Sequence, residues 1–283
     1  MRTFLTAFLL CSSAVMTVQA APTLNAADSD PVKQQWMQGF PPAADKQLTA
    51  DSSSFFQFPA MRWSVAHMRQ FMPTVEVSRG LDNAQPLPYA LDKHIDDIQF
   101  TPLNSDKPIR FKESLGLNYT DGLIVLHRGK VVYEQYFGEL SEDKQHAAMS
   151  VTKSITGLLA AVLVAEGKLD ANKKVAHYLP ELKNSCFGDA SVRQVMNMTT
   201  ALEFSEDYAN PKAEIWSYSA AANPPANYKG PVGYYQALAP IQINGKHGHA
   251  FGYKTPNADA LGWLHAQAAN LYMNYCLKRC GVK

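Results

Sequence analysis

The chain has 283 residues and a formal net charge of +1, with 26 basic and 25 acidic residues. This balance, without a basic stripe or an acidic tail, argues against binding nucleic acid and against a charge-driven partner. The sequence contains no internal repeat and no low-complexity tract, which excludes solenoid and array architectures. The length suits one large domain or two lobes.

Residues 1–20 have the pattern of a secretory signal peptide. Arg2 provides the positive start, residues 4–18 the apolar core, and the last three residues a small-residue cleavage site. The apolar run is too short for a membrane span. A lipoprotein signal through Cys11 is the weaker reading, because a leucine precedes it where a small residue is expected. We therefore expect a secreted or periplasmic protein.

The next part of the chain predicts an arm and then a folded domain. Residues 21–60 are rich in Ala, Asp, Ser, Pro and Gln and predict a loose N-terminal arm. Residues 62–69 predict one or two helical turns before Pro73. Residues 61–265 are expected to form the domain that carries the chemistry.

Residues 121–138 contain two runs rich in β-branched and aromatic residues. A turn at Arg128-Gly129-Lys130 joins them, which predicts a β-hairpin. His127 stands at the end of the first run, and we interpret it as a surface strand position, not a chemical group.

The stretch from Met149 to Ser154, followed by the apolar residues 155–164, predicts the first turn of a buried helix. Ser150 and Lys153 lie three residues apart, so they share one helix face with Cβ atoms about 5–6 Å apart. A lysine amine that is neutral, or paired with another base, can take the serine proton and create a nucleophile. The helix N-terminus adds N–H groups where an oxyanion would develop.

Two alternatives weigh against this interpretation of Ser150. A serine at the start of a helix is also a plain N-cap, and the motif alone does not separate the two roles. The same Ser-x-x-Lys spacing occurs at Ser141 and Lys144, in a charged stretch that we interpret as a solvated loop. Only Ser150 opens an apolar helix, the rigid platform that a catalytic serine needs.

Downstream of this helix, residues 191–198 predict a short helix with a serine cap. Residues 209–240 form a long, aromatic-rich connection of the kind that often serves as a binding lid. Residues 257–264 predict the start of another helix, with Tyr253 just before it. A phenol there acts as a general base if cationic neighbours lower its pKa, but taken alone Tyr253 fits a packed aromatic better.

The histidines and cysteines do not predict a metal centre. His247 and His249 raise the question, but no Asp or His stands two residues beyond His249 to extend the set. Cys186 is expected to be structural. Cys276 and Cys280 lie four residues apart near the end without a histidine or carboxylate to complete a ligand set, and we interpret them as incidental thiols.

Several of these segments, in this order, resemble one family: the serine β-lactamase-related hydrolases, closest to class C β-lactamases, DD-peptidases and 6-aminohexanoate-dimer hydrolases. Ser-x-x-Lys is among the signatures of that group. The resemblance covers about residues 60–265, and residues 62–80 are similar to the N-terminal arm of the nylon-oligomer branch. The other matching pieces are residues 121–138, 150–153, 166–170, 178–182, 198–200 and 247–253.

The resemblance implies an α+β fold of the β-lactamase/transpeptidase type, with an antiparallel sheet and a largely helical domain carrying the Ser-x-x-Lys helix. It implies cleavage of a small amide or ester through an acyl-serine, without metal or other cofactor. Ser150 would attack the carbonyl, its N–H forming half of the oxyanion hole, and Lys153 would take or share its proton. Tyr253 would protonate the leaving group and activate the deacylating water. Tyr208 would contact the substrate from a lid.

This sequence departs from the family pattern in several places. Thr255 stands where many relatives have the Asn of a Tyr-x-Asn motif, and Ala201 replaces a usual glycine. Residues 266–283 form an atypical tail, whereas relatives continue into a third motif and further sheet strands. The resemblance therefore also implies a truncated chain without the second oxyanion donor, a loss on the order of 10²–10³ in rate. The alternative is an inactive remnant that at most binds amide or cell-wall-like ligands.

Overall fold

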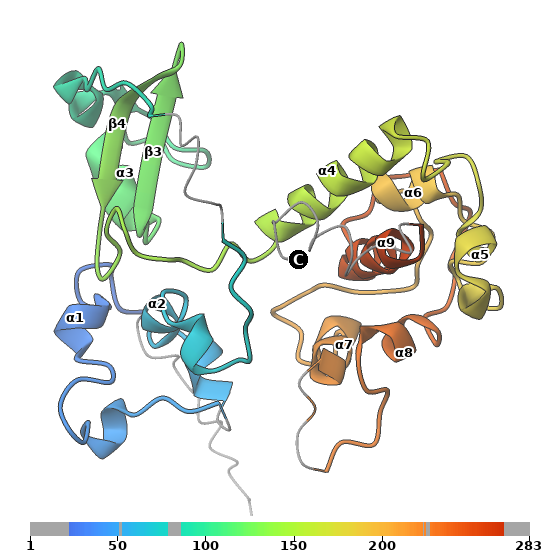
Figure 1. Ribbon diagram of the computed structural model, residues 1–283. Helices are drawn as coiled ribbons and strands as arrows, with labels where there is room; N and C mark the ends of the chain where they lie inside the picture. Colours follow the sequence, from blue (N-terminus) through green and yellow to red (C-terminus); the bar gives the residue numbers. More distant parts are fainter. Residues whose placement is uncertain (1–22, 51–52, 79–85, 223, 225–226, 269–283) are drawn as a thin grey trace, which may run out of the picture. The chain divides into compact units, whose positions relative to one another are not determined.

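A computed structural model of the chain describes residues 23–50, 53–78, 86–222, 224 and 227–268 (Figure 1). The expected signal peptide and residues 269–283 of the expected tail, with Cys276 and Cys280, lie outside the described residues. The described residues divide into two compact units: unit 1 from Met1–Phe71 and Pro86–Gln145, and unit 2 from Met72–Gln85 and His146–Lys283. None of the described helices has the length and apolarity that a bilayer span requires.

The N-terminal part of unit 1 is more ordered than its composition indicates. Leu48 and Phe55 are buried in it, although both fall in the segment expected to be a loose arm. The buried guanidinium of Arg62 donates to Ala26 O at 2.6 Å and forms an ion pair with Asp121 at 3.1 Å. These long-range contacts organise short elements: α1 (Pro31–Gln34), η1 (Ala44–Lys46), η2 (Ser53–Phe56), α2 (Met61–Ser64) and η3 (Met68–Gln70).

The predicted hairpin is present in unit 1 as β3 (Gly122–His127) and β4 (Lys130–Tyr136). The strands are antiparallel, from Gly122 opposite Tyr136 to His127 opposite Lys130. Arg128 and Gly129 have φ of +50° and +76°, as a two-residue turn that follows strand twist requires. The other elements of the unit are η4 (Lys93–Asp97), β1 (Gln99–Phe100), β2 (Ile109–Arg110) and α3 (Phe111–Leu117). Within the described residues, each of the two sheets has two strands.

Unit 2 is helical and is built around α9 (Thr255–Ala268) (Figure 1). This helix packs against α4 (Val151–Ala165), α5 (Val175–Tyr178), α6 (Val192–Met196) and α8 (Tyr234–Leu238). Its core contains fully buried side chains from these helices and from the loop before α6, among them Val175, Phe187, Leu238 and Leu264. The predicted short helix is α6, which starts after Ser191 with a capping box between Ser191 and Gln194. The unit also contains η5 (Pro180–Leu182) and α7 (Glu214–Ala222).

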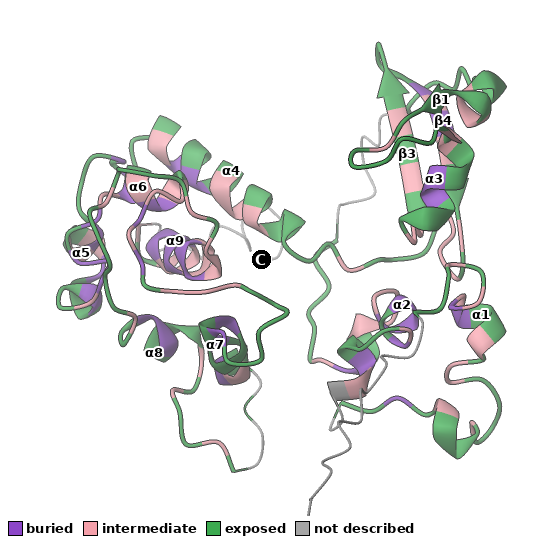
Figure 2. Cartoon of the chain, turned by 180° about the vertical axis from the view of Figure 1, so that it is seen from behind, coloured by how far each residue is buried: buried purple, intermediate pink, exposed green. Residues whose placement is uncertain are grey.

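The prediction that α4 is a buried helix is wrong for the described part of the chain. Its buried residues are Ala160 and Leu163, and most of its surface is exposed (Figure 2). The apolar side chains that predicted burial form a stripe on the exposed side, with between 36% and 65% of their area accessible. Periodicity shows that a helix face is apolar but does not show what covers it. The exposed stripe consists of Val151, Ile155, Leu158, Leu159 and Val162.

Candidate active site

Ser150 and Lys153 meet at the first turn of α4. Lys153 Nζ lies 2.9 Å from Ser150 Oγ, within hydrogen-bond distance. Ser150 occupies the N-cap position with φ of −71° and ψ of −7°, but its side chain makes no capping hydrogen bond. A helix-capping serine has extended backbone angles and accepts a hydrogen bond from an N–H of the first turn. The geometry of Ser150 thus fits a hydroxyl paired with an amine and not a plain cap.

The backbone before Ser150 is unusual. Met149 has φ of +45°, in the left-handed region that non-glycine residues occupy at a cost. This conformation turns the chain sharply into α4 and leaves Ser150 exposed at the turn. Within the described residues the Ser150 N–H donates no hydrogen bond, so it is available to an incoming oxyanion. No sequence pattern had indicated the strain at Met149.

Tyr253 completes the predicted trio. The amine of Lys153 lies 5.4 Å from the centre of the Tyr253 ring, within the range of a cation–π contact. Tyr253 is 44% exposed, which argues against a purely packed aromatic. The structure therefore brings Ser150, Lys153 and Tyr253 together within unit 2, although they come from α4 and from the loop before α9. Their chemical roles stay predictions.

The loop before Tyr253 is held by backbone bonds to the segment after α6. Gly252 N donates to Met198 O at 2.9 Å, and Gly248 N donates to Thr199 O at 2.7 Å. These two bonds join the Met-x-Thr segment to the tyrosine loop, two of the pieces on which the family resemblance rests. They place Tyr253 relative to the unit 2 core.

His247 also holds this loop in place. The backbone N–H of Ala201 donates to its Nδ1 at 2.9 Å, so Nε2 carries the proton and donates to Asp189 at 3.1 Å. Both ring nitrogens of His247 are thereby occupied, which leaves none to bind a metal ion. Among the described residues no group of three or more His, Cys, Asp or Glu side chains is arranged to hold one. His247 thus forms a structural tie that sequence reasoning had missed.

A carboxylate that the sequence did not single out lies close to the site. Asp259, on α9, accepts a hydrogen bond of 2.8 Å from the hydroxyl of Tyr218. Burial raises the pKa of the Asp259 carboxyl, while the Tyr218 hydrogen bond and the charge of Lys153 act in the opposite direction. The charge of Lys153 thus acts on the Asp259 carboxyl. One turn of helix after Thr255, Asp259 carries no local pattern that would have identified it.

Tyr208, the predicted substrate contact, lies on the segment that follows Leu202. Its side chain is 57% exposed, and its ring packs edge-on against Trp216 at 5.7 Å. Its hydroxyl lies 3.3 Å from Glu206 Oε2. Burial and the nearby Glu206 charge raise the pKa of Tyr208, and Tyr253 adds to the same effect. The structure therefore places Tyr208 in the electrostatic neighbourhood of Tyr253.

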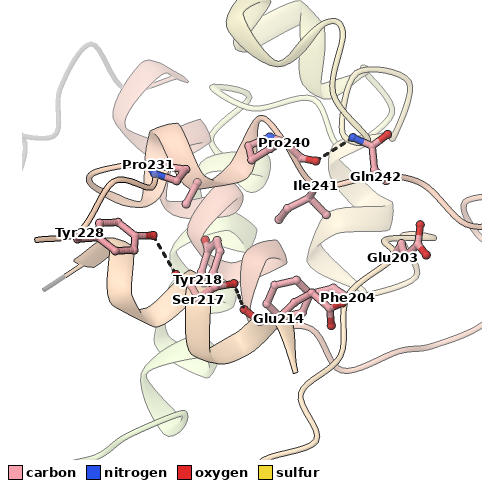
Figure 3. A pocket seen from close by; sticks show the side chains of 11 residues that line it. Glu203, Phe204, Glu214, Ser217, Tyr218, Tyr228, Pro231, Pro240, Ile241 and Gln242 are labelled. Atoms are coloured by element: carbon pink, nitrogen blue, oxygen red, sulfur yellow. Dashed lines mark hydrogen bonds between the residues drawn. The ribbon is translucent and has the colours of Figure 1, made fainter. Parts of the chain in front are cut away.

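A cavity of about 320 Å³ lies elsewhere in unit 2, between α7 and the segment before the tyrosine loop (Figure 3). None of Ser150, Lys153 and Tyr253 lines it. Its wall shares only Tyr218 with the site, through the hydroxyl that bonds Asp259. The chemistry therefore points to the trio and not to this cavity. Its lining residues are Glu203, Phe204, Glu214, Ser217, Tyr218, Tyr228, Pro231, Ala237, Pro240, Ile241 and Gln242.

The chain is similar to a known family and to several known proteins. A family model described as Beta-lactamase matches residues 119–274. The chain is 30% identical over 233 residues to the 6-aminohexanoate-dimer hydrolase of Paenarthrobacter ureafaciens, across 82% of this chain and 56% of that protein. A Beta-lactamase of Providencia stuartii is 43% identical over 53 residues, which is 19% of this chain and 14% of that protein.

One solved structure is similar over most of the described chain. It is named "Putative 6-aminohexanoate-dimer hydrolase from Bacillus anthracis", and it matches with a TM-score of 0.71 and 28% identity. The match covers 81% of this chain and 60% of that one, so the chain spans little more than half the length of its relatives. This structural match confirms the predicted fold class.

Proposed function

Because the chain belongs to the beta-lactamase family, we propose that it is a serine hydrolase that cleaves a small amide or ester through an acyl-serine. The proposal depends on one observation: the Lys153 amine lies 2.9 Å from the Ser150 hydroxyl at the start of α4. That separation allows direct proton transfer from the hydroxyl to a neutral amine. The Tyr253 ring, 5.4 Å from the same amine, supplies a second proton carrier.

The steps follow from these positions. Lys153 in its neutral form takes the Ser150 proton as Oγ attacks the carbonyl carbon of the substrate. The tetrahedral intermediate collapses when the leaving nitrogen or oxygen receives a proton, which Tyr253 donates. A water molecule then attacks the acyl-serine, its proton passes to the phenolate of Tyr253, and Oγ leaves with the proton held by Lys153.

The negative charge that develops on the carbonyl oxygen needs hydrogen-bond donors. The Ser150 N–H is available for this role, and the N-terminus of α4 contributes its partial positive charge. A single donor of this kind is worth on the order of 10²–10³ in rate. Ser150 thus supports the proposal in two ways, as the nucleophile and as one donor to the oxyanion.

A linear amide is the substrate class that we favour. The relative from Paenarthrobacter ureafaciens and the solved relative are both named for the 6-aminohexanoate dimer. The exposed Tyr208 and its neighbour Trp216 offer an aromatic surface against which an extended aliphatic chain can pack. A chain that binds such an amide without cleaving it is the alternative, and the following experiment separates the two.

The test is turnover of a chromogenic ester and of a linear amide such as a 6-aminohexanoate dimer. We expect Ser150→Ala to abolish turnover. Ser141→Ala is the matched control, because Ser141 has the same spacing to a lysine but its hydroxyl bonds Asp143 in unit 1. Turnover that survives in Ser150→Ala, or a wild type that binds the amide without releasing product, would refute the proposal.

A further inference from the structure

We propose that Glu206 is a positioning residue for this site: its carboxylate holds Tyr208 and the start of α9 in a fixed relation, and thereby orients Tyr253. The inference rests on the proposed function and extends it to a residue outside the trio. Glu206 is only partly exposed and lies on the segment between Leu202 and α7.

The contacts of Glu206 reach two elements at once. One carboxylate oxygen accepts a hydrogen bond from the backbone N–H of Thr255. The other is 3.0 Å from the hydroxyl of Thr255 and 3.3 Å from the hydroxyl of Tyr208. The side chain of Glu206 therefore joins Tyr208 to Thr255, the first residue of α9, which lies 49 positions after Glu206.

The position of Thr255 makes this link relevant to the chemistry. Thr255 is the first residue of α9 and stands two residues after Tyr253. A carboxylate at a helix N-terminus satisfies an N–H that has no partner within the helix and interacts well with the helix dipole. Glu206 thus fixes the start of α9, into which the Tyr253 loop leads. The threonine hydroxyl provides the second contact.

The charge of Glu206 also acts on groups around the site. It raises the pKa of Tyr208, together with burial, and it opposes ionisation of Asp259. Loss of the charge should therefore change the titration of Tyr208 even where the backbone does not move.

Small displacements at such a site have large effects on rate. A shift of about 1 Å in a catalytic group can cost about 10²-fold. Glu206→Gln keeps the size of the side chain but loses the charge, and it places an amide donor beside groups that themselves donate. We expect its acylation rate to fall about 10- to 100-fold, with a lower kcat through Tyr253 and a higher KM through Tyr208.

The first experiment measures the rate at which a fluorophosphonate probe labels the full chain, with unfolding curves to verify the fold. The matched control is Glu203→Gln, which removes a carboxylate from the same segment without touching Thr255 or Tyr208. We expect it to label at the wild-type rate. Thr255→Val should lose part of the rate that Glu206→Gln loses, and Thr255→Ser, which keeps the hydroxyl, should lose less.

The second experiment does not need activity. With ¹³Cζ-labelled tyrosine, the NMR signal that disappears in Tyr208→Phe reports the titration of Tyr208. We expect Glu206→Gln to lower the pKa of that signal, and Glu203→Gln to leave it in place. A Glu206→Gln chain with wild-type labelling and an unchanged Tyr208 signal would overturn the positioning role. A wild type that is not labelled at Ser150 would instead overturn the proposed function, while the Tyr208 signal still decides whether Glu206 holds Tyr208.

Discussion

The hydroxyl of Thr200 donates a hydrogen bond of 2.6 Å to the amide oxygen of Asn257, and both side chains are buried. Thr200 belongs to the segment after α6, and Asn257 lies in the first turn of α9. The bond therefore crosses the unit 2 core just behind the loop that carries Tyr253. Together with the backbone bonds of Gly248 and Gly252, it fixes where the phenol stands.

Removing this bond should destabilise unit 2. Thr200→Val keeps the shape of the side chain but leaves the Asn257 oxygen without that donor. A buried polar group that loses its partner costs about 1–3 kcal/mol, which denaturant unfolding followed by circular dichroism will measure. Thr199→Val is the control, because its hydroxyl makes only a 3.4 Å contact with Gln194 O. Equal losses in the two variants would show that the Thr200 bond has no special weight.

Two glycines that face open space predict opposite effects of the same substitution. An added Cβ would meet nothing within 4 Å at Gly129 or at Gly157. Gly129 has φ of +76° in the hairpin turn, so Gly129→Ala should cost about 1 kcal/mol. Gly157 lies inside α4, so Gly157→Ala should stabilise by about 0.5–1 kcal/mol. Unfolding midpoints that move in the same direction would contradict the assigned conformations.

His265 should make stability depend on pH. Burial lowers its pKa from 6.5 to about 4. Below about pH 6.5 the unfolded chain binds a proton that the folded chain refuses until about pH 4, so the free energy of unfolding falls as the pH falls through this window. The loss reaches on the order of 3 kcal/mol near pH 4 and is absent above about pH 6.5. His265→Gln should remove this part of the pH dependence. Parallel curves of unfolding free energy against pH for wild type and His265→Gln would contradict this role of His265.

The exposed stripe on α4 predicts a different response from its buried side. Leu158 is 61% exposed and Leu163 is 7% exposed. Leu158→Glu should change the free energy of unfolding by less than about 0.5 kcal/mol and reduce light scattering, because exposed apolar patches promote association. Leu163→Glu places a charge in the core and should prevent folding. A Leu158→Glu chain that fails to fold would show that the stripe is covered.

Local patterns were enough to predict part of this fold. The hairpin and α6 follow from alternation, turn residues and a capping box, all of which act over a few residues. The order of the N-terminal segment did not follow, because it depends on Arg62, whose partners Ala26 and Asp121 lie 36 and 59 positions away. The exposure of α4 could not be predicted for a similar reason, since its neighbours are distant in the sequence.

The site residues also divide into those that a local sequence pattern predicts and those that it does not. Ser150 and Lys153 were predicted because helical geometry alone brings side chains three positions apart together. The roles of Tyr253 and Tyr208 came from the family resemblance. The structure places Tyr253 near Lys153, and Tyr208 within the electrostatic reach of Tyr253. Asp259 and Glu206 were missed, because a single carboxylate has no spacing that a sequence pattern can detect.

The central claim is that Ser150 is a nucleophile activated by Lys153. Its most direct test is intact-mass and peptide mass spectrometry after reaction with a fluorophosphonate, comparing wild type, Ser150→Ala, Lys153→Met and Ser141→Ala. The account predicts one added group on the peptide with Ser150 in wild type and in Ser141→Ala, much slower addition in Lys153→Met, and none in Ser150→Ala. Equal labelling of Ser150→Ala, or a group attached to a serine other than Ser150, would contradict it.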